Sequence, residues 1–370
     1  MRIGIDMRPL QEEYLTGIGR YELSVLKTIS SLDLSAHGIE RIVLLTFGAS
    51  PLNAEARSLI AQPLFKHTHL KGSNKLRNLH IAFGGTIKGD AKGIDVWWLP
   101  HLGFFRSRTV PYVVTIHDAS FFVAPFFYSP RMRLWHAALH ARRLLREAAS
   151  IIAISDSTKR ELIRCIPEVE SRVFVCTPAM PISVEPIRHT ATTNNLPRPY
   201  ILFLGTIEPR KNVLAVLKAY RYLTRSLRSY DLVIAGAPGW SSGAVHKHIQ
   251  SEQGVHWRSY VSEEEKMLLL HNASAFIWPS FYEGFGFPPL EALAHGVPVV
   301  ASHRTSLPEI LRERASYGNP HLPLEFARLL QRALTTDVKK QTEKHSPDNP
   351  WKRHTEEILL RTRLAYENRH

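Results

Sequence analysis

One stretch, residues 275–294, limits the possible folds more than any other part of the chain. Its apolar run Ala275–Trp278 is typical of a buried strand, and the run stops at Pro279. A loop rich in glycine and proline follows. Because proline suits the first turn of a helix, we expect a helix to begin near Pro289. Similar apolar runs alternate with helical patterns along the whole chain, which indicates an α/β fold with parallel sheets.

Two carboxylates bracket this loop, because Glu283 and Glu291 have seven residues between them. The intervening residues include Gly284, Phe285, Gly286 and Phe287. Glycine leaves backbone N–H groups accessible and a helix start directs them, an arrangement that binds anions and sugar hydroxyls. The alternative interpretation is a capping loop whose glutamates are solvated, since such junctions are common.

Chain length and net charge limit the number of domains and the kinds of partner. A chain of 370 residues is long enough for about two domains. Its 47 basic and 33 acidic residues give a net charge of +14, which suits nucleic acid, an anionic membrane or an anionic small substrate. No zinc-finger spacing, RNA-binding motif or basic tail occurs. We therefore expect no nucleic-acid partner, but a phosphorylated substrate and peripheral contact with an anionic membrane.

The cysteines and the apolar runs predict the compartment. Cys165 and Cys176 do not form a CxxC pair, so two thiols in a reducing cytoplasm are favoured over one disulfide. The N-terminal residues 1–6 have the pattern of a strand rather than of a signal peptide. No apolar run reaches the roughly 18–20 residues of a spanning helix. We expect a cytoplasmic protein whose membrane contact, if any, is peripheral.

A Gly-x-Gly turn follows the first predicted strand. Gly17 and Gly19 open a helix there, which is a geometry suited to phosphate. The dinucleotide fingerprint is absent, because Glu22 occupies the third glycine position and strand 41–47 lacks an acidic residue for a ribose. A nicotinamide-dependent enzyme is therefore disfavoured.

Two further motifs lie at the ends of predicted strands. His117 follows strand 111–116, at the edge where open α/β sheets bind ligands, although a lone histidine is more often a structural hydrogen-bonding residue. Arg210 and Lys211 precede a helix over 213–223 and form a small anion clamp. The alternative for this pair is two exposed basic side chains.

Two segments allow more than one interpretation. A basic helix over 130–146 has Leu134, Ala138 and Leu145 on an expected core face, with its arginines either solvated or in contact with anionic lipid headgroups. Residues 50–93 have an irregular pattern, which fits either acceptor-binding loops or a surface excursion.

Taken together, these motifs resemble retaining glycosyltransferases of the GT-B architecture. The resemblance is to the large family 4, the glycosyltransferase group 1 type, and most of all to bacterial polysaccharide and O-antigen mannosyltransferases. It rests on His117-Asp118, Pro209-Arg210-Lys211 and the Glu283–Glu291 loop in this order, and it becomes weak after Ile310.

The resemblance implies an α/β fold with two Rossmann-like domains that face each other across a donor cleft. The first, residues 1–187, would bind the acceptor, and a linker over 188–199 would follow. The second, residues 200–347, would bind the nucleotide sugar. The segment 348–370 would form a C-terminal helix that returns to the first domain.

The resemblance also implies the roles of the site residues. The residues implied at the donor are Gly17, Arg210, Lys211, Tyr260, Val261, Gly284, Phe285, Gly286, Phe287 and Glu291. His117 and Glu283 are implied as catalytic.

Arg210 and Lys211 would stabilise the leaving diphosphate, which the Gly17 loop would cover. Glu283 and the loop backbone would hold the sugar hydroxyls, and Glu291 would accept from the ribose. His117 would lie near the reacting carbon. The backbone near Tyr260 would meet the base. No Asp-x-Asp element occurs, so neither a metal nor another cofactor is expected.

The expected reaction is sugar transfer with retention, by attack on the leaving-group face, with a covalent Glu283 intermediate as the less favoured route. GDP-mannose is the expected donor, ahead of other GDP-, UDP- or dTDP-sugars. The acceptor would be a growing lipid-linked surface glycan at the inner face of the plasma membrane. The alternatives are a sugar-nucleotide epimerase of the same fold and a non-catalytic partner subunit. Glu283→Ala or Lys211→Ala is expected to abolish transfer and leave the fold intact.

Overall fold

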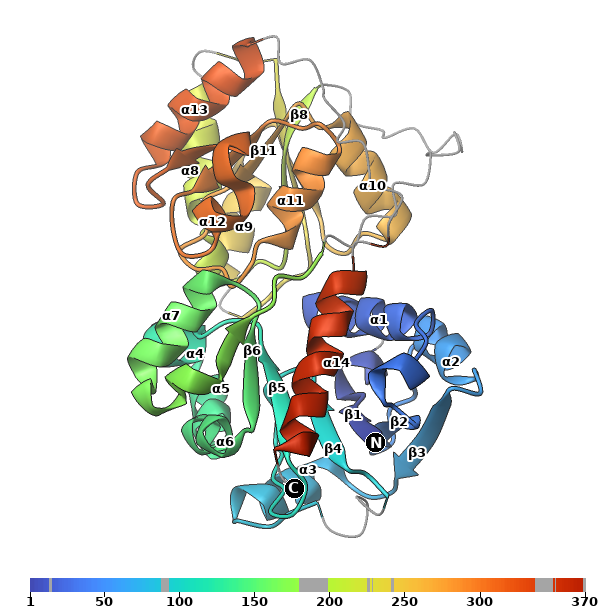
Figure 1. Cartoon of the computed structure of the whole chain (residues 1–370). Coiled ribbons are helices and arrows are strands. Elements are labelled where there is room, and N and C mark those ends of the chain that lie inside the picture. The colour runs from blue at the N-terminus through green and yellow to red at the C-terminus, as the bar shows by residue number, and fades with distance from the viewer. Residues whose placement is uncertain are drawn as a thin grey trace. The chain divides into compact units, whose positions relative to one another are not determined.

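The computed structural model describes residues 1–12, 15–87, 93–179, 199–224, 227, 229–240, 243–336, 349 and 351–368. Contacts divide the chain into two compact units (Figure 1). The first unit comprises residues 1–125, 130–181 and 346–370, and the second comprises 126–129 and 182–345. The predicted linker lies outside the described residues except for Pro199.

The described residues of the first unit form a seven-stranded parallel sheet in the order β3-β2-β1-β4-β5-β6-β7. Its strands are β1 (Arg2–Asp6), β2 (Arg41–Phe47), β3 (Phe65–Leu70), β4 (Val96–Leu99), β5 (Tyr112–Ile116), β6 (Ser150–Ala153) and β7 (Val173–Val175). Successive strand residues point to opposite faces, so Leu44 packs into one core and Leu45 into the other. Both faces are buried, which explains why the strands are almost continuous apolar runs.

Helices cover both faces of this sheet. They are α1 (Gly17–Ile29), α2 (Ala54–Ile60), α3 (Asn74–Ala82), α4 (Ser120–Val123), α5 (Pro130–Ala138), α6 (Ala141–Glu147), α7 (Asp156–Cys165) and α14 (Lys352–Glu367). Shorter 3-10 turns are η1 (Arg8–Gln11), η2 (Ser35–His37), η3 (Pro125–Phe127) and η4 (Pro167–Arg172). The C-terminal helix α14 lies beside α1 and packs on β4, β5 and β6, so its expected return to the first domain is confirmed (Figure 1).

Two predictions for the first unit are wrong. Residues 50–93 are not irregular, because their described part contains α2, β3 and α3. The basic helix over 130–146 is interrupted at His140, whose φ of 48° is left-handed. Because of this break, α5 and α6 do not share one continuous core face. Leu145 is fully buried as expected, but Leu134 is 72% exposed.

The described residues of the second unit form a six-stranded parallel sheet in the order β10-β9-β8-β11-β12-β13. Its strands are β8 (Tyr200–Leu204), β9 (Asp231–Ala235), β10 (Val255–Arg258), β11 (Ala275–Trp278), β12 (Val299–Ser302) and β13 (Ala315–Gly318). Its helices are α8 (Val213–Thr224), α9 (Gly243–Ser251), α10 (Glu263–Asn272), α11 (Phe287–Ala294), α12 (Leu307–Leu311) and α13 (Pro323–Thr335), with 3-10 turns η5 (Pro209–Lys211) and η6 (Arg312–Arg314).

Each sheet reverses its strand order at one place. The reversal lies between β1 and β4 in the first unit and between β8 and β11 in the second. Open α/β sheets bind ligands outside the carboxyl ends of the strands at such a reversal, because the following loops diverge there and leave a crevice. No helix among the described residues is both long and apolar enough to cross a membrane.

Candidate functional site

Lys211 and Glu283 meet at the strand reversal of the second unit. Lys211 ends the η5 turn that follows β8, and Glu283 lies in the loop that follows β11. The Lys211 Nζ donates to both carboxylate oxygens of Glu283, at 2.6 and 2.8 Å. The sheet therefore brings together two predicted site residues at the edge where a ligand is expected.

This ion pair is buried. Lys211 is 9% exposed and Glu283 is 5% exposed. Burial lowers the pKa of Lys211, and the Glu283 carboxylate opposes that shift. The ammonium also lies 4.6 Å from the centroid of the Trp278 ring, where a cation is attracted to the aromatic face. The interpretation of Glu283 as a solvated loop residue is therefore wrong.

Arg210 is also held in place. Its guanidinium pairs with the buried carboxylate of Glu208, and its backbone carbonyl accepts a hydrogen bond of 2.8 Å from the Phe281 N–H. Asn212 follows with a left-handed φ of 57° and donates to the Pro279 carbonyl at 3.1 Å. These bonds tie the η5 turn to the loop after β11, so the basic pair is not two loose surface side chains.

Gly286 sets the shape of the loop before α11. Its φ is 101°, and a Cβ there would lie 2.6 Å from Leu307 Cδ2. Glycine is therefore required both by the backbone conformation and by the close approach. The helix begins at Phe287, two residues before the expected start, with Pro288 and Pro289 in its first turn.

Thr305 and Ser306 follow β12 and hydrogen-bond the loop before α11. Neither residue was predicted from the sequence. The Glu283 N–H donates to Thr305 Oγ1 at 2.9 Å. Ser306 Oγ donates to the carbonyls of Glu283 and Phe285, at 3.0 and 3.1 Å. Thr305 has a φ of 53°, which is uncommon for a β-branched residue. The only signal in the sequence was the position of both residues just after a predicted strand.

Glu291 has a partner that sequence reasoning also missed. It is 8% exposed on α11, and Lys266 of α10 donates to its Oε1 at 2.9 Å. Tyr260 and Val261 lie just before α10, whose N-terminus is capped by Ser262, which accepts from the Glu265 N–H. Tyr260 is 52% exposed, so its side chain is accessible to solvent.

The first unit carries Gly17 and His117 at the carboxyl edge of its own sheet. Gly17 is exposed as the first residue of α1, and nothing lies within 4 Å of a Cβ added there. The His117 Nε2 lies 2.8 Å from the Pro100 carbonyl oxygen. A carbonyl can only accept, so Nε2 carries the proton. Burial lowers the pKa of His117, which keeps the ring neutral and its Nδ1 an acceptor.

A second group of titratable residues surrounds the β1–β4 reversal. Asp6 pairs with Arg8, and this charge holds the Asp6 pKa below its ordinary value although burial opposes ionisation. Burial raises the pKa of Glu22 well above its ordinary value, and among the described residues neither Glu22 oxygen has a hydrogen-bond partner. Burial lowers the pKa of His101 to about 4. These groups place several titratable side chains beneath the β1–β4 reversal.

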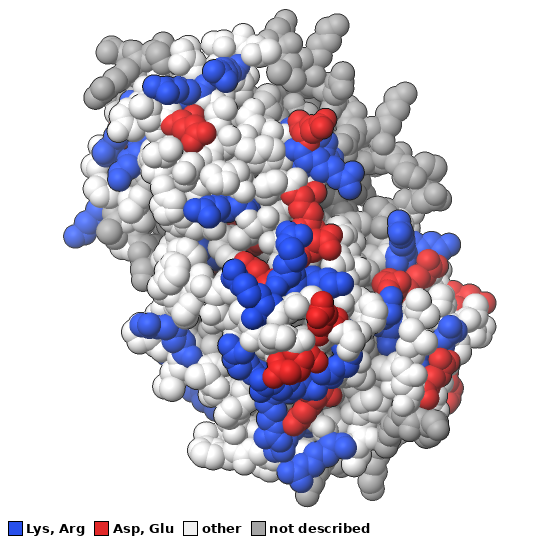
Figure 2. Space-filling model, turned by 60° about the vertical axis from the view of Figure 1, so that its left-hand side comes forward, with Lys and Arg blue, Asp and Glu red and all other residues white. Residues whose placement is uncertain are grey.

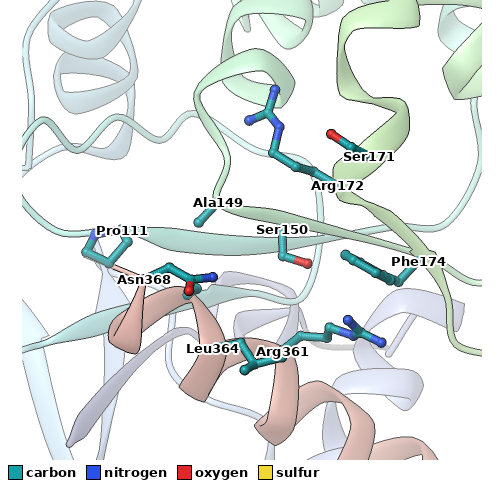
Figure 3. Close-up of a pocket in the computed structure, with 10 residues that line it drawn as sticks. Pro111, Ala149, Ser150, Ser171, Arg172, Phe174, Arg361, Leu364 and Asn368 are labelled. Atoms are coloured by element: carbon teal, nitrogen blue, oxygen red, sulfur yellow. The ribbon is translucent and has the colours of Figure 1, made fainter. Parts of the chain in front are cut away.

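A groove of about 430 Å³ lies elsewhere in the first unit (Figure 3). Pro111 and Ser150 mark the starts of β5 and β6, and Arg361 and Leu364 of α14 form the opposite wall. These are the amino ends of the strands, opposite the edge where the predicted site residues lie. None of the predicted site residues lines this groove.

On the face shown in Figure 2, the described basic side chains alternate with acidic ones. Two arginines of α6 illustrate this, because Arg143 pairs with Glu147 at 2.7 Å and Arg146 with Glu168 at 2.8 Å. The interpretation of these arginines as a solvated face therefore fits α6.

Known proteins resemble this chain in sequence and in fold. The family described as "Glycosyl transferases group 1" matches residues 186–345. O-antigen chain mannosyltransferase B of Escherichia coli is 30% identical over 338 residues, which cover 83% of this chain and 84% of that protein. The serotype-specific mannosyltransferase WbdA of Escherichia coli is 30% identical over 204 residues, which cover 52% of this chain and 25% of that protein. The sucrose-phosphate synthase of Thermosynechococcus elongatus has the same fold, with a TM-score of 0.69 at 15% identity and coverage of 100% and 97%.

Proposed function

Because this chain belongs to the glycosyl transferases group 1 family, we propose that it transfers mannose from GDP-mannose to a hydroxyl of a growing lipid-linked surface glycan. The chain is a glycosyltransferase. One observation carries the choice of sugar, namely the 30% identity over 84% of the length of an O-antigen chain mannosyltransferase. The acceptor proposal rests on the same relative.

The chemistry of the leaving group supports a role for Lys211 and Arg210. A nucleoside diphosphate gains negative charge as the bond to the sugar breaks, and preorganised cations stabilise that charge in a partly buried site. Glu283 uses two of the three ammonium protons of Lys211. We infer that the third donates to a phosphate oxygen of the donor. We infer that these cations and the N–H groups near Gly286 take the place of a divalent metal.

Glu283 is better suited to hold sugar hydroxyls than to attack the sugar. Both of its oxygens accept hydrogen bonds from Lys211, which lowers the nucleophilicity of the carboxylate. An ionised carboxylate only accepts, and sugar hydroxyls can donate to it. We infer retention of configuration by attack of the acceptor on the leaving-group face.

Helices α3 and α5 of the first unit support peripheral contact with an anionic membrane. Their C-terminal ends meet where His140 lies 3.2 Å from the Ala82 carbonyl oxygen. Large apolar side chains are exposed on both helices: Leu76, Leu79, Phe83, Leu134 and Trp135. Neither helix contains an acidic residue, and both contain Lys or Arg. Basic side chains beside exposed apolar ones suit an anionic bilayer surface.

The first experiment is a thermal-shift screen of GDP, UDP and dTDP in the presence of a metal chelator. A ligand that binds only the native state raises stability by about 2.7 kcal/mol at a hundredfold excess over Kd. A shift with GDP alone is the expected result. A shift with UDP or dTDP would replace the donor, and a shift that requires a divalent ion would refute metal independence.

The second experiment follows radiolabelled GDP-mannose with and without a lipid-linked glycan acceptor. Transfer that requires the acceptor, with an α-linked product by NMR from the α-linked donor, is expected. Free epimerised sugar without acceptor would indicate a sugar-nucleotide epimerase. Absence of any turnover alongside nucleotide binding would favour a non-catalytic partner subunit.

The membrane proposal has its own test, which needs no donor. Co-sedimentation with vesicles containing phosphatidylglycerol, but not with phosphatidylcholine alone, is expected. Replacing Leu79, Phe83 and Trp135 with serine should abolish binding. Replacing Arg143 and Arg146 with glutamine is the matched control and should preserve most of it, because both arginines are paired with carboxylates. Equal binding by both variants would contradict the assignment of this surface.

A further inference from the structure

A buried chain of hydrogen bonds joins the C-terminal helix to the core beneath His117. Cys176 Sγ lies 3.0 Å from His354 Nδ1, and His354 Nε2 lies 2.9 Å from the Tyr21 hydroxyl. Cys176, His354 and Tyr21 are all less than 7% exposed. Three segments far apart in the sequence, α1, the end of β7 and α14, thus share one polar connection inside the first unit.

One direction of hydrogen bonding satisfies every member of this chain. The Tyr21 hydroxyl donates to His354 Nε2, and His354 Nδ1 donates to Cys176. The Cys176 thiol donates to the His354 carbonyl at 3.5 Å.

The protonation states agree with this direction. Burial lowers the pKa of His354 to about 4, so its ring is neutral and carries a single N–H. Burial raises the pKa of Cys176 to about 12, so it remains a thiol and keeps its donor proton. Burial likewise raises the pKa of Tyr21, which remains a phenol. Each of these three groups therefore carries one proton.

The far side of the Tyr21 ring meets His117. The two ring centroids are 4.7 Å apart and the rings are perpendicular, so an edge of one faces the plane of the other. The His117 imidazole is held by its Cβ–Cγ bond and by the Nε2 bond to the Pro100 carbonyl. The Tyr21 ring, packed against it, limits the remaining rotation about the Cβ–Cγ bond. Trp351 packs edge-on against Tyr21 at 5.7 Å and supports it from α14.

A simple core role would not need these polar groups. A phenylalanine at position 21 would fill the same space without a hydroxyl that must be satisfied, and a buried polar network is favourable only when every member has a partner. Here every member has one, and such networks define a single orientation of the side chains within them.

We propose that His354, acting through the Tyr21 hydroxyl and supported by Cys176, is a positioning residue that holds the His117 imidazole in its working orientation. This inference rests on the proposed function in one respect, namely that His117 contacts the donor sugar. The C-terminal helix then contributes to catalysis without touching substrate.

The kinetic test is a double-mutant cycle with His354→Phe and Tyr21→Phe. Each variant retains an aromatic ring and loses the hydrogen bond between the two residues. We expect each to lower kcat about tenfold, the effect of one hydrogen bond, with the KM for the donor changed much less. The double variant should be no slower than either single variant, because both remove the same link. Additive losses, or wild-type kcat in either single variant, would overturn the proposal.

Two variants at Cys176 test the end of the chain. Cys176→Ser keeps a donor and an acceptor and should retain near-wild-type kcat. Cys176→Val keeps the size of the side chain and removes both, so it should resemble His354→Phe. Equal kcat in both variants would remove Cys176 from the network.

A spectroscopic test needs no substrate. The ¹⁵N shifts of the His117 ring, assigned by comparison with His117→Gln, should report one Nε2-protonated tautomer in the wild type and a mixture in Tyr21→Phe and His354→Phe. An unchanged spectrum in both variants would refute the positioning role. A changed spectrum in a chain that transfers no sugar would refute the proposed function and leave the positioning role intact.

Discussion

The Lys211 ammonium and the Glu283 carboxylate are 72 residues apart in the sequence and 2.6 Å apart in the second unit. Their pairing makes the anion clamp and the sugar-binding loop one structural element. A substitution at either residue therefore disturbs both the clamp and the loop. Single and double substitutions are expected to differ in their effect on stability.

Single substitutions at this pair should lower both stability and transfer. Glu283→Ala leaves a buried ammonium without its carboxylate, and removing one partner of a buried pair costs about 3–5 kcal/mol. This differs from the expectation from sequence alone, which was an intact fold. Urea unfolding and the transfer assay measure the two effects. The double variant Lys211→Met/Glu283→Gln is the control: it should recover most of the stability and none of the transfer. A single variant as stable as the wild type would contradict the buried pair.

Gly286→Ala should distort the loop before α11. The left-handed conformation alone costs about 1–2 kcal/mol for a residue with a Cβ, and the Cβ would also meet Leu307. Gly38→Ala is the matched control, because Gly38 has a φ of 69° and nothing within 4 Å of an added Cβ. We expect Gly286→Ala to lose more stability than Gly38→Ala, as measured by unfolding. We expect only Gly286→Ala to raise the Kd for GDP, as measured by thermal shift. Equal losses in both variants would show that the contact with Leu307 is relieved without cost.

Glu22→Gln should stabilise the protein increasingly as the pH rises. Burial raises the pKa of Glu22 above its ordinary value of 4.5, so above that pH the unfolded chain ionises first. The stability that comes from the protonated carboxyl is complete below pH 4.5 and is lost as the pH rises towards the folded pKa. The slope is at most about 1.4 kcal/mol per pH unit.

Denaturant unfolding of Glu22→Gln and the wild type between pH 4 and 9 measures this pH-dependent difference in stability. The control variant is Glu55→Gln, because the Glu55 carboxylate is exposed and pairs with Lys27. Parallel curves for Glu22→Gln and the wild type would mean that Glu22 is ionised in the folded protein.

His354→Phe should weaken the loss of stability in acid. The pKa of His354 is lowered by burial from 6.5 to about 4. The stability gained from a neutral buried ring is therefore complete above pH 6.5 and is lost as the pH falls towards 4. Removing this group should make the slope of unfolding free energy between pH 6 and 4.5 shallower by about 1.4 kcal/mol per pH unit. His37→Phe, at a half-buried position outside this network, is the control variant. An identical slope in His354→Phe would mean that His354 titrates normally.

Strands buried on both faces were predictable from the sequence. The segments 41–47, 111–116 and 275–278 match β2, β5 and β11 closely, because parallel strands covered by helices are continuous apolar runs. The edge strand β3 was not predicted, because it is not a continuous apolar run. Its residues include Lys66, His67 and His69, and most of them are exposed or half-buried, so no apolar run marks it.

The motif residues were likewise predictable, but their partners were not. Glycine at position 286 and basic residues at 210 and 211 have local signatures, because turn conformation and helix entry depend on neighbouring residues. Thr305 and Lys266 have no such signature, and they support Glu283 and Glu291 only after β12 and α10 have packed beside the loop.

The sequence by itself determined which segments are buried and where the chain turns, because both follow from the period of apolar residues and from local backbone preferences. Only the tertiary structure decided which buried polar groups meet. Tyr21 and His354 are 333 residues apart, and Lys211 and Glu283 are 72 apart. Such contacts depend on the strand order of each sheet and on where α14 docks. Their energy exists only after those distant segments have closed on one another, so no local pattern encodes it.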